Sequence, residues 1–291
     1  MYMFGLSKCL VCVAFLFVLL HNTDSAACDS AISISRNCGT GGCDVITFRQ
    51  NDFKRDIDNV SEVLSKAFES RCQICSERGN MSAVPRDCMD IQQLGYRNTG
   101  VYIIYPIRST PVQVRCDMDT DSGGWTVIQR RLSDTVFSKA WQEYKDGFGD
   151  LNGNFWLGND IINTLTTREP MSLRIDMKVF NESSSVTYSN FSVDNEAAKY
   201  RLTVSGYSGL AGDSLVTHNG MMFTTKYHDN DANELNCADR YHGGWWYHGG
   251  CVHSNLNGEF GNNKAAEGIL WYTWKGHFQS LTMSEMKIRR T

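Results

Sequence analysis

The chain has 291 residues, 42% of them hydrophobic, which is enough to form a packed core in one large domain or two smaller ones. Its formal net charge is −4, and no long Lys/Arg run occurs. This balance excludes the basic footprint typical of nucleic-acid binding and of attachment to anionic membrane surfaces. We therefore expect no nucleic-acid partner.

A secretory signal peptide is predicted over residues 1–27. Lys8 supplies a positive charge, an apolar run covers residues 9–20, and small residues around Ala27 suit cleavage. The run is shorter than the roughly 20 apolar residues that a membrane span needs. An uncleaved anchor remains the alternative. We expect a secreted, extracellular protein that starts near Cys28 and does not insert into the membrane.

The cysteines and sequons are consistent with secretion. Two of the eleven cysteines lie within the predicted signal, which leaves nine: Cys28, Cys38, Cys43, Cys72, Cys75, Cys88, Cys116, Cys237 and Cys251. In an oxidising compartment most should form disulfides, and an odd number leaves at least one free or joined to another chain. Candidate N-glycosylation sites stand at Asn59, Asn80, Asn181 and Asn190.

Residues 28–82 form a Cys-containing N-terminal segment in this interpretation. Residues 28–43 are rich in Ser, Gly and Cys and are predicted to be a loop held by disulfides. A heptad stripe then begins at Ile46 and continues through Phe53, Val60 and Ala67. It predicts a short helix, either amphipathic against the neighbouring domain or a coiled coil that joins copies of the protein. A linker follows over residues 78–85.

From residue 83 onward the pattern changes to strands and turns. Alternating apolar residues predict a half-buried strand over 173–179 and another over 200–204, and β-branched or aromatic runs predict strands over 101–105 and 125–129. Residues 141–148 and 159–165 are predicted to be helical. The sequence thus indicates an α+β domain built on antiparallel sheet over residues 83–291.

One loop carries oxygen-bearing side chains at alternate positions. Asp229, Asp231 and Asn233 would face one side of a turn, an arrangement suited to a hard cation. An EF-hand is excluded, because Glu234 stands where that loop needs glycine and Arg240 stands where it needs glutamate. A solvated acidic turn is the alternative on spacing alone.

A second acidic string is interpreted differently. Asp117, Asp119 and Asp121 also alternate, but Gly123 and Gly124 follow at once. We interpret this string as a turn between strands.

No recognisable enzyme motif occurs in the sequence. It contains no HExxH, GxSxG, Walker or GxGxxG string. The single CxxC, from Cys72 to Cys75, lies outside any thioredoxin-like context. We therefore predict that the protein is not an enzyme.

Several strings resemble a known family. They are CDMDTDSGGWTVIQRR from Cys116, NFWLGND from Asn154, DNDANELNC from Asp229, GWWYHGGC from Gly244 and SEMKIRR from Ser284. In this order they resemble the fibrinogen-related domain of ficolins, tachylectins and invertebrate fibrinogen-related lectins. The resemblance covers residues 83–291. Because no collagen-like repeat precedes it, a tachylectin-like arrangement fits better than a ficolin.

The resemblance implies two disulfides and a calcium site. The disulfides would be Cys88–Cys116 and Cys237–Cys251, which their spacing also permits. The Ca²⁺ ligands would be the side chains of Asp229 and Asp231, the backbone carbonyls of Asn233 and Leu235, and waters.

The resemblance also implies a pocket for N-acetyl groups beside the calcium loop. Its candidate residues are Tyr241, His253, Ala266 and His277, and a cis peptide bond is expected at Gly250–Cys251. The sequence departs from the family pattern by one extra residue before Cys251 and by Ala265 and His277, which stand where the family has tyrosines. We therefore expect weaker binding of simple N-acetylated sugars, unless a side chain such as Tyr272 or His248 fills the gap.

Together these features predict a secreted, calcium-dependent lectin or pattern-recognition protein that binds acetylated or related glycans in innate defence. We expect it to form homo-oligomers, linked by disulfides through residues 28–82. The alternative is a non-lectin adhesion or signalling module that binds a protein partner.

Overall fold

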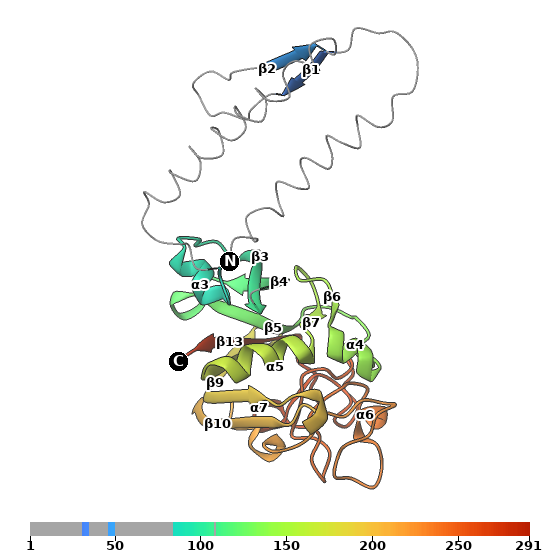
Figure 1. Ribbon diagram of the computed structural model, residues 1–291. Helices are drawn as coiled ribbons and strands as arrows, with labels where there is room; N and C mark the ends of the chain where they lie inside the picture. The colour runs from blue at the N-terminus through green and yellow to red at the C-terminus, as the bar shows by residue number, and fades with distance from the viewer. Residues whose placement is uncertain (1–30, 35–45, 50–83, 108) are drawn as a thin grey trace. The chain divides into compact units, whose positions relative to one another are not determined.

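The structure is a computed structural model that describes residues 31–34, 46–49, 84–107 and 109–291, and the chain divides into two units, Met1–Ser82 and Ala83–Thr291 (Figure 1). In the first unit, β1 (Ala31–Ile34) and β2 (Ile46–Arg49) form an antiparallel pair. The prediction of a loop at residues 31–34 and of a helix from Ile46 is therefore wrong at these positions. Isoleucine, threonine and phenylalanine in these strands favour extended backbone.

The other sequence predictions for the first unit lie outside the described residues. They are the signal peptide, the remainder of the heptad stripe, the cysteines before residue 83, and the sequons at Asn59 and Asn80.

The second unit is an α+β domain with short helices. These are α3 (Cys88–Gln93), α4 (Trp141–Asp146), α5 (Asn159–Arg168), α6 (Cys237–Arg240) and α7 (Tyr272–Lys275). The strands are β3 (Gly100–Ile107), β4 (Thr110–Asp117), β5 (Trp125–Arg131), β6 (Phe148–Gly149), β7 (Phe155–Trp156), β8 (Met171–Val179), β9 (Glu182–Val193), β10 (Leu202–Gly209), β11 (Ser254–Asn255), β12 (Leu270–Trp271) and β13 (Met283–Arg290). None of the helices described is long and apolar enough to cross a bilayer.

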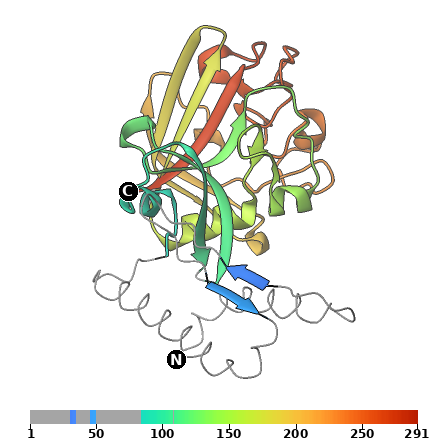
Figure 2. The same ribbon diagram turned by 90° about the horizontal axis from the view of Figure 1, so that it is seen from above.

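The main sheet has the strand order β10-β9-β8-β13-β5-β4-β3, and β7 and β6 extend it from β5. All of these pairs are antiparallel, and Figure 2 shows β13 between the strands that precede it in sequence. Leu173, Ile175 and Met177 are buried on one face of β8, as their alternation predicts. The predicted strands and the two predicted helices are confirmed, except that α4 ends at Asp146, Phe148 belongs to β6, and β10 begins at Leu202.

Helix α5 packs on β9 and contacts α4 (Figure 1). Ile162 and Leu165 point into the core, and the hydroxyl of Thr166 accepts the backbone N–H of Val193 at 3.1 Å. This contact fixes the helix against the end of β9.

A loop-rich subdomain of short elements follows β10. Trp245, Trp246 and Trp271 are completely buried in it, and the indole N–H of Trp246 donates to the carbonyl of Tyr200 at 2.7 Å. The interpretation of the two adjacent tryptophans as core residues is confirmed. Because regular secondary structure is sparse here, side-chain packing and side-chain hydrogen bonds hold the loops.

Both predicted disulfides are present. Cys88 bonds to Cys116 and joins α3 to β4, and Cys237 bonds to Cys251 across a sequence separation of 14 residues. The second bond closes the loop that borders the candidate site.

Candidate cation and recognition site

The loop 229–235 is organised by successive side-chain-to-backbone hydrogen bonds. A side-chain oxygen of Asp229 accepts the N–H of Asp231 at 3.2 Å, and an oxygen of Asp231 accepts the N–H of Asn233 at 2.9 Å. The side-chain oxygen of Asn233 then accepts the N–H of Leu235 at 2.9 Å. Each is an Asx turn, the local structure that Asp and Asn favour. The alternating residues therefore curl the backbone into a compact loop.

This loop is tied to the Cys237–Cys251 disulfide at two points. The second carboxylate oxygen of Asp231 accepts the N–H of Cys237 at 3.0 Å, and the side-chain amide of Asn233 donates to the carbonyl of Gly249 at 2.7 Å. The position of the acidic loop is thus coupled to the segment that ends at Cys251.

The donor atoms of the loop suit a hard cation. Neither Asp229 nor Asp231 forms an ion pair with a basic side chain of the described residues. Burial and the adjacent Asp229 carboxylate raise the pKa of Asp231, against the opposing effect of the N–H groups of Asn233 and Cys237. The carbonyls of Asn233 and Leu235 accept no hydrogen bond from the described residues. Two uncompensated carboxylates and two free carbonyls match the oxygen ligands that Ca²⁺ prefers.

Three of the four predicted pocket residues lie together. The rings of His253 and Tyr272 stack with centroids 4.9 Å apart and planes 8° apart, and Tyr272 also meets His277 at 4.3 Å. The N–H of Ala266 donates to the carbonyl of His277 at 2.7 Å. We call His253, Tyr272 and His277 the aromatic row. Ala266 supports the row through its backbone, since its side chain is buried.

Tyr241 lies on a different part of the site. It ends α6, its carbonyl accepts the side-chain amide of Asn255 at 2.9 Å, and Arg240 approaches its ring at 5.4 Å. Within the described residues, no hydrogen bond or ring contact joins Tyr241 to the aromatic row.

A buried histidine holds the backbone beneath the row. His218 is fully buried; its Nδ1 bonds to the carbonyl of Trp246 at 2.7 Å, and its Nε2 accepts the N–H groups of His253 at 3.2 Å and Ser254 at 3.0 Å. These contacts place the proton on Nδ1. Burial lowers the pKa of His218 to about 3, so the ring is neutral at physiological pH.

His248 joins this cluster from the disulfide loop. Its ring lies 5.1 Å from that of His218 and 5.8 Å from that of His253. Nε2 of His248 and Nδ1 of His253 are both buried without a hydrogen-bond partner among the described residues. Burial, and then the charge on His253, lower the pKa of His248 and that of His277.

The expected cis bond at Gly250–Cys251 is wrong, because every peptide bond in the described residues is trans. The extra glycine changes the turn: the N–H of Cys251 donates to the carbonyl of His248 at 2.8 Å, and the reverse bond measures 3.3 Å. Gly249 and Gly250 therefore form a tight two-residue connection. Cys251 completes the change of direction with φ of 64°.

Two exposed rings at this site were not among the predicted pocket residues. Tyr272, considered only as a side chain that could fill the gap, is the centre of the aromatic row. Phe278 follows His277 and is 70% exposed. A large exposed aromatic side chain beside a polar loop is a typical contact for a ligand. Ala265 is exposed at the same edge.

The two described sequons lie on the surface of the main sheet. Asn181 is exposed in the turn between β8 and β9, and Asn190 is exposed on β9 opposite Ser205. Both side chains are accessible to a glycan. They lie on different elements from the aromatic row.

Comparison with known proteins gives the family. Residues 84–291 match the family model of fibrinogen beta and gamma chains, C-terminal globular domain. Fibrinogen C domain-containing protein 1-A of Xenopus laevis is 48% identical over 216 residues, which are 70% of this chain and 47% of that protein. The chain thus spans about half the length of this curated relative. Techylectin-5A of Tachypleus tridentatus is 45% identical over 220 residues, 72% of this chain and 75% of that protein.

A solved structure shares the architecture. Lamprey fibrin D-dimer, complexed with the peptide Gly-His-Arg-Pro-amide, superimposes with a TM-score of 0.67 at 30% identity over 82% of this chain and 89% of its own. The same antiparallel sheet and loop-rich subdomain therefore occur in both. By its fold and by the match over its second unit, this protein belongs to the family of C-terminal globular domains of fibrinogen beta and gamma chains.

Proposed function

We propose that the protein is a secreted, calcium-dependent lectin that binds acetylated or related surface glycans in innate defence. The observation that carries the proposal is the aromatic row beside an oxygen-rich loop, with the Cys237–Cys251 segment between them. Its similarity to Techylectin-5A supports a lectin role. Proteins of this family are in general non-enzymatic.

Ca²⁺ would be held by the side chains of Asp229 and Asp231 and by the carbonyls of Asn233 and Leu235. It would neutralise the two carboxylates and fix the loop. Because Asn233 donates to Gly249, an ordered loop also holds the turn that precedes Cys251. Calcium dependence of ligand binding follows from this connection.

The aromatic row offers a rigid face for an acetyl group. Tyr272 stacks between His253 and His277, which supports the alternative that Tyr272 replaces the missing tyrosines. Stacked rings provide a large contact surface with little loss of conformational entropy. We therefore assign the acetyl-binding wall to Tyr272, with Phe278 at its open edge.

Calorimetry tests the recognition site. In Ca²⁺, the parent protein should bind N-acetylglucosamine, Tyr272→Ala should weaken binding at least about tenfold, and Ala265→Tyr should change it little. Tyr227→Ala, which removes an exposed ring from a loop outside the aromatic row, is the matched control. Unchanged binding by Tyr272→Ala would contradict the assignment. A gain in affinity in Ala265→Tyr would show that the wall is incomplete.

Thermal melts test the calcium site. A ligand that binds only the native state at a hundredfold excess over its Kd adds about 2.7 kcal/mol of stability. The melting temperature should therefore rise with Ca²⁺, and Asp229→Ala should abolish the rise. Glu234→Ala, an exposed acidic side chain in the same loop, should keep it. Identical melts with Ca²⁺ and with chelator would exclude a calcium site here.

The second candidate is a module that binds a protein partner through the same surface. It is favoured by the likeness to lamprey fibrin, which is solved with a peptide ligand. A glycan array with and without chelator separates the candidates. Chelator-sensitive glycan binding supports the lectin, and a folded, calcium-saturated protein that binds no glycan supports a peptide or protein ligand.

A further inference from the structure

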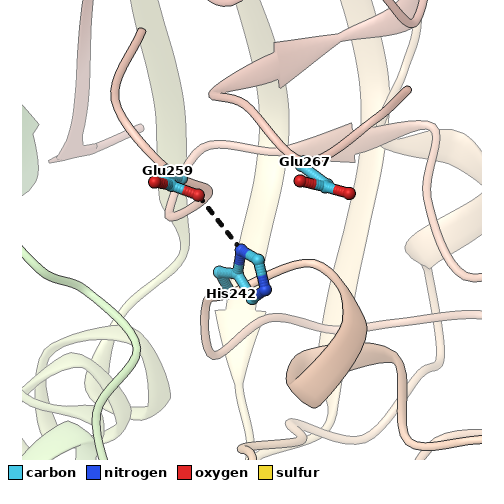
Figure 3. A group of neighbouring side chains, drawn as sticks. All are labelled: His242, Glu259 and Glu267. Carbon is cyan, nitrogen blue, oxygen red and sulfur yellow. Dashed lines mark hydrogen bonds and ion pairs between the residues drawn. The ribbon is translucent and has the colours of Figure 1, made fainter. Parts of the chain in front are cut away.

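Three metal-ligating side chains that belong neither to the aromatic row nor to the acidic loop lie close together. They are His242, which follows α6, and Glu259 and Glu267 from the loop 258–268 (Figure 3). One ligand atom from each lies within 4.8 Å of the others, and His242 Nδ1 is 3.2 Å from a carboxylate oxygen of Glu259. We propose that these three side chains form a site for a divalent transition-metal ion such as Zn²⁺.

The backbone already holds the two carboxylates side by side. The N–H of Glu259 donates to the carbonyl of Glu267 at 2.9 Å, and Glu259 and Gly268 form a parallel bridge. A Cβ on Gly258 would lie 2.1 Å from the carbonyl oxygen of Gly268, so the two segments approach as closely as only glycine permits. The ligand positions thus rest on a fixed backbone.

An amide orients both carboxylates toward one point. The side-chain nitrogen of Asn262 donates to Glu259 and to Glu267, at 2.9 Å in each case, while its oxygen accepts the N–H of Lys264. Groups that fix metal ligands from behind in this way are part of functional metal sites. Asn262 is therefore the positioning residue.

The charge balance of the cluster favours a cation. Among the described residues, no lysine or arginine nitrogen lies within ion-pair distance of Glu259 or Glu267, and the imidazole of His242 is the only basic group paired with Glu259. Two carboxylates this close repel each other. A divalent ion removes that repulsion, and the His242 ring can keep its proton on Nε2 while Nδ1 binds the metal.

The donor types select the class of metal. Calcium and magnesium prefer oxygen ligands alone, whereas one imidazole nitrogen with carboxylate oxygens suits Zn²⁺ and similar ions. In a tetrahedral zinc site with bonds of about 2.0–2.1 Å, neighbouring ligand atoms lie about 3.3 Å apart. The ligand atoms of the three side chains now lie up to 4.8 Å apart. Rotation of the half-exposed Glu259 and His242 side chains would bring them to the shorter distance. The fourth position faces solvent and takes water.

Zinc titration of the full-length protein, saturated with Ca²⁺ so that the 229–235 loop is occupied, tests the site. Calorimetry should show that the parent binds one Zn²⁺. His242→Ala and Glu267→Gln should each lower the affinity for Zn²⁺ by at least about tenfold. Asn262→Ala should weaken binding about 10- to 100-fold while all three ligands remain. Co²⁺ substitution gives an independent readout: its visible absorption should change in His242→Ala, because a nitrogen ligand is lost.

Two control variants remove the same chemical groups elsewhere. His228→Ala removes an imidazole that stacks on Trp141, and Glu182→Gln removes an exposed carboxylate on β9. Both should bind Zn²⁺ like the parent. Absence of Zn²⁺ binding by the parent would overturn the proposal, as would parental affinity in both His242→Ala and Glu267→Gln. Neither result bears on the lectin proposal, which depends on other residues.

Discussion

A single buried lysine forms ion pairs with three carboxylates on the polar face of the sheet. Lys287 on β13 is 2% exposed, and its ammonium lies 2.5 Å from Asp117, 2.7 Å from Asp176 and 2.9 Å from Glu285. Burial opposes the charged form of Lys287, yet Glu285 and the two aspartates raise its pKa overall. Burial also disfavours ionised Asp117, but its hydrogen bond with Lys287 holds the pKa of that carboxyl below its ordinary value.

Removing this lysine should strongly destabilise the domain. Lys287→Met leaves Asp117 without a cation among the described residues, whereas Asp176 still pairs with Arg174 and Glu285 with Arg130. Breaking one partner of a buried ion pair typically costs about 3–5 kcal/mol. Urea unfolding at pH 7 measures the loss. Lys178→Met on β8, where the side chain is exposed, should stay within about 0.5 kcal/mol of the parent. Equal effects in both variants would contradict the role given to Lys287.

The buried His218 predicts loss of stability in acid. Its folded-state pKa of about 3 lies below the value of about 6.5 in an unfolded protein. Between these values the unfolded state binds a proton that the folded state does not, so stability is complete above about pH 6.5 and falls as the pH drops toward 3. The lowered pKa values of His248 and His277 act in the same direction.

Unfolding free energies measured between pH 8 and 4 test this expectation. The parent should lose up to about 1.4 kcal/mol per pH unit from His218. His218→Phe should be less stable at pH 8, because the N–H groups of His253 and Ser254 lose their acceptor, but its pH dependence should be shallower. If the variant and the parent differ in unfolding free energy by the same amount at every pH, His218 does not contribute to the pH dependence of stability.

Sequence reasoning at this scale succeeded where the chemistry is local. The Asp117 string was predicted to be a turn, and its carboxylates indeed bond to Lys287, Thr99 and Arg174. Tyr272 could not be placed in the same way. It reaches His253 only because β11 and β12 pair, with Ser254 opposite Trp271, and such long-range pairing leaves no periodic signal.

At the scale of elements, alternation and helical periodicity located the strands and helices of the main sheet, because one face of each is buried. Two predictions for short segments failed: the heptad at its first position, which came from periodicity, and the cis bond, which came from the family resemblance. The β1–β2 pair contradicts the heptad at its first position, and the Gly249-Gly250 turn replaces the expected cis bond. In both cases the backbone conformation depends on pairing with another segment, β1 with β2 and His248 with Cys251, which the local sequence does not reveal.

The disulfide loop is the element on which the proposed calcium site depends. Replacing Cys237 and Cys251 by serine should lower stability by about 3 kcal/mol, the chain-entropy estimate for a loop of this length. It should also weaken Ca²⁺ binding, because Asp231 and Asn233 bond to Cys237 and Gly249. Calorimetry with Ca²⁺ measures the second effect.

The other disulfide supplies the matched control. Replacing Cys88 and Cys116 by serine removes a bond of similar kind between α3 and β4, far in sequence from the acidic loop. That variant should lose stability but keep its Ca²⁺ affinity. If both variants lose affinity equally, the coupling is global unfolding and not the contacts at Cys237.

At the scale of the whole molecule, the cysteine count predicts covalent oligomers. The sequence has eleven cysteines, or nine without residues 1–27, so an odd one remains in either case. Two disulfides lie within the described domain. Linking several weak sites raises avidity by making later contacts intramolecular. Electrophoresis should show multimers that collapse on reduction; a monomer under both conditions, with a monomeric mass in solution, would contradict this.

The central place of β13 has a consequence for biosynthesis. β13 pairs with both β5 and β8, yet it is translated after every other strand of its sheet. A nascent polypeptide therefore carries two half-sheets, β3-β4-β5 and β8-β9-β10, whose facing edges have unpaired backbone groups prone to aggregation. A product that stops before Met283 would contain the acidic loop and the aromatic row but could not join the halves. We expect chaperones to retain it, so a secretion assay would detect the loss of β13 before any binding assay could.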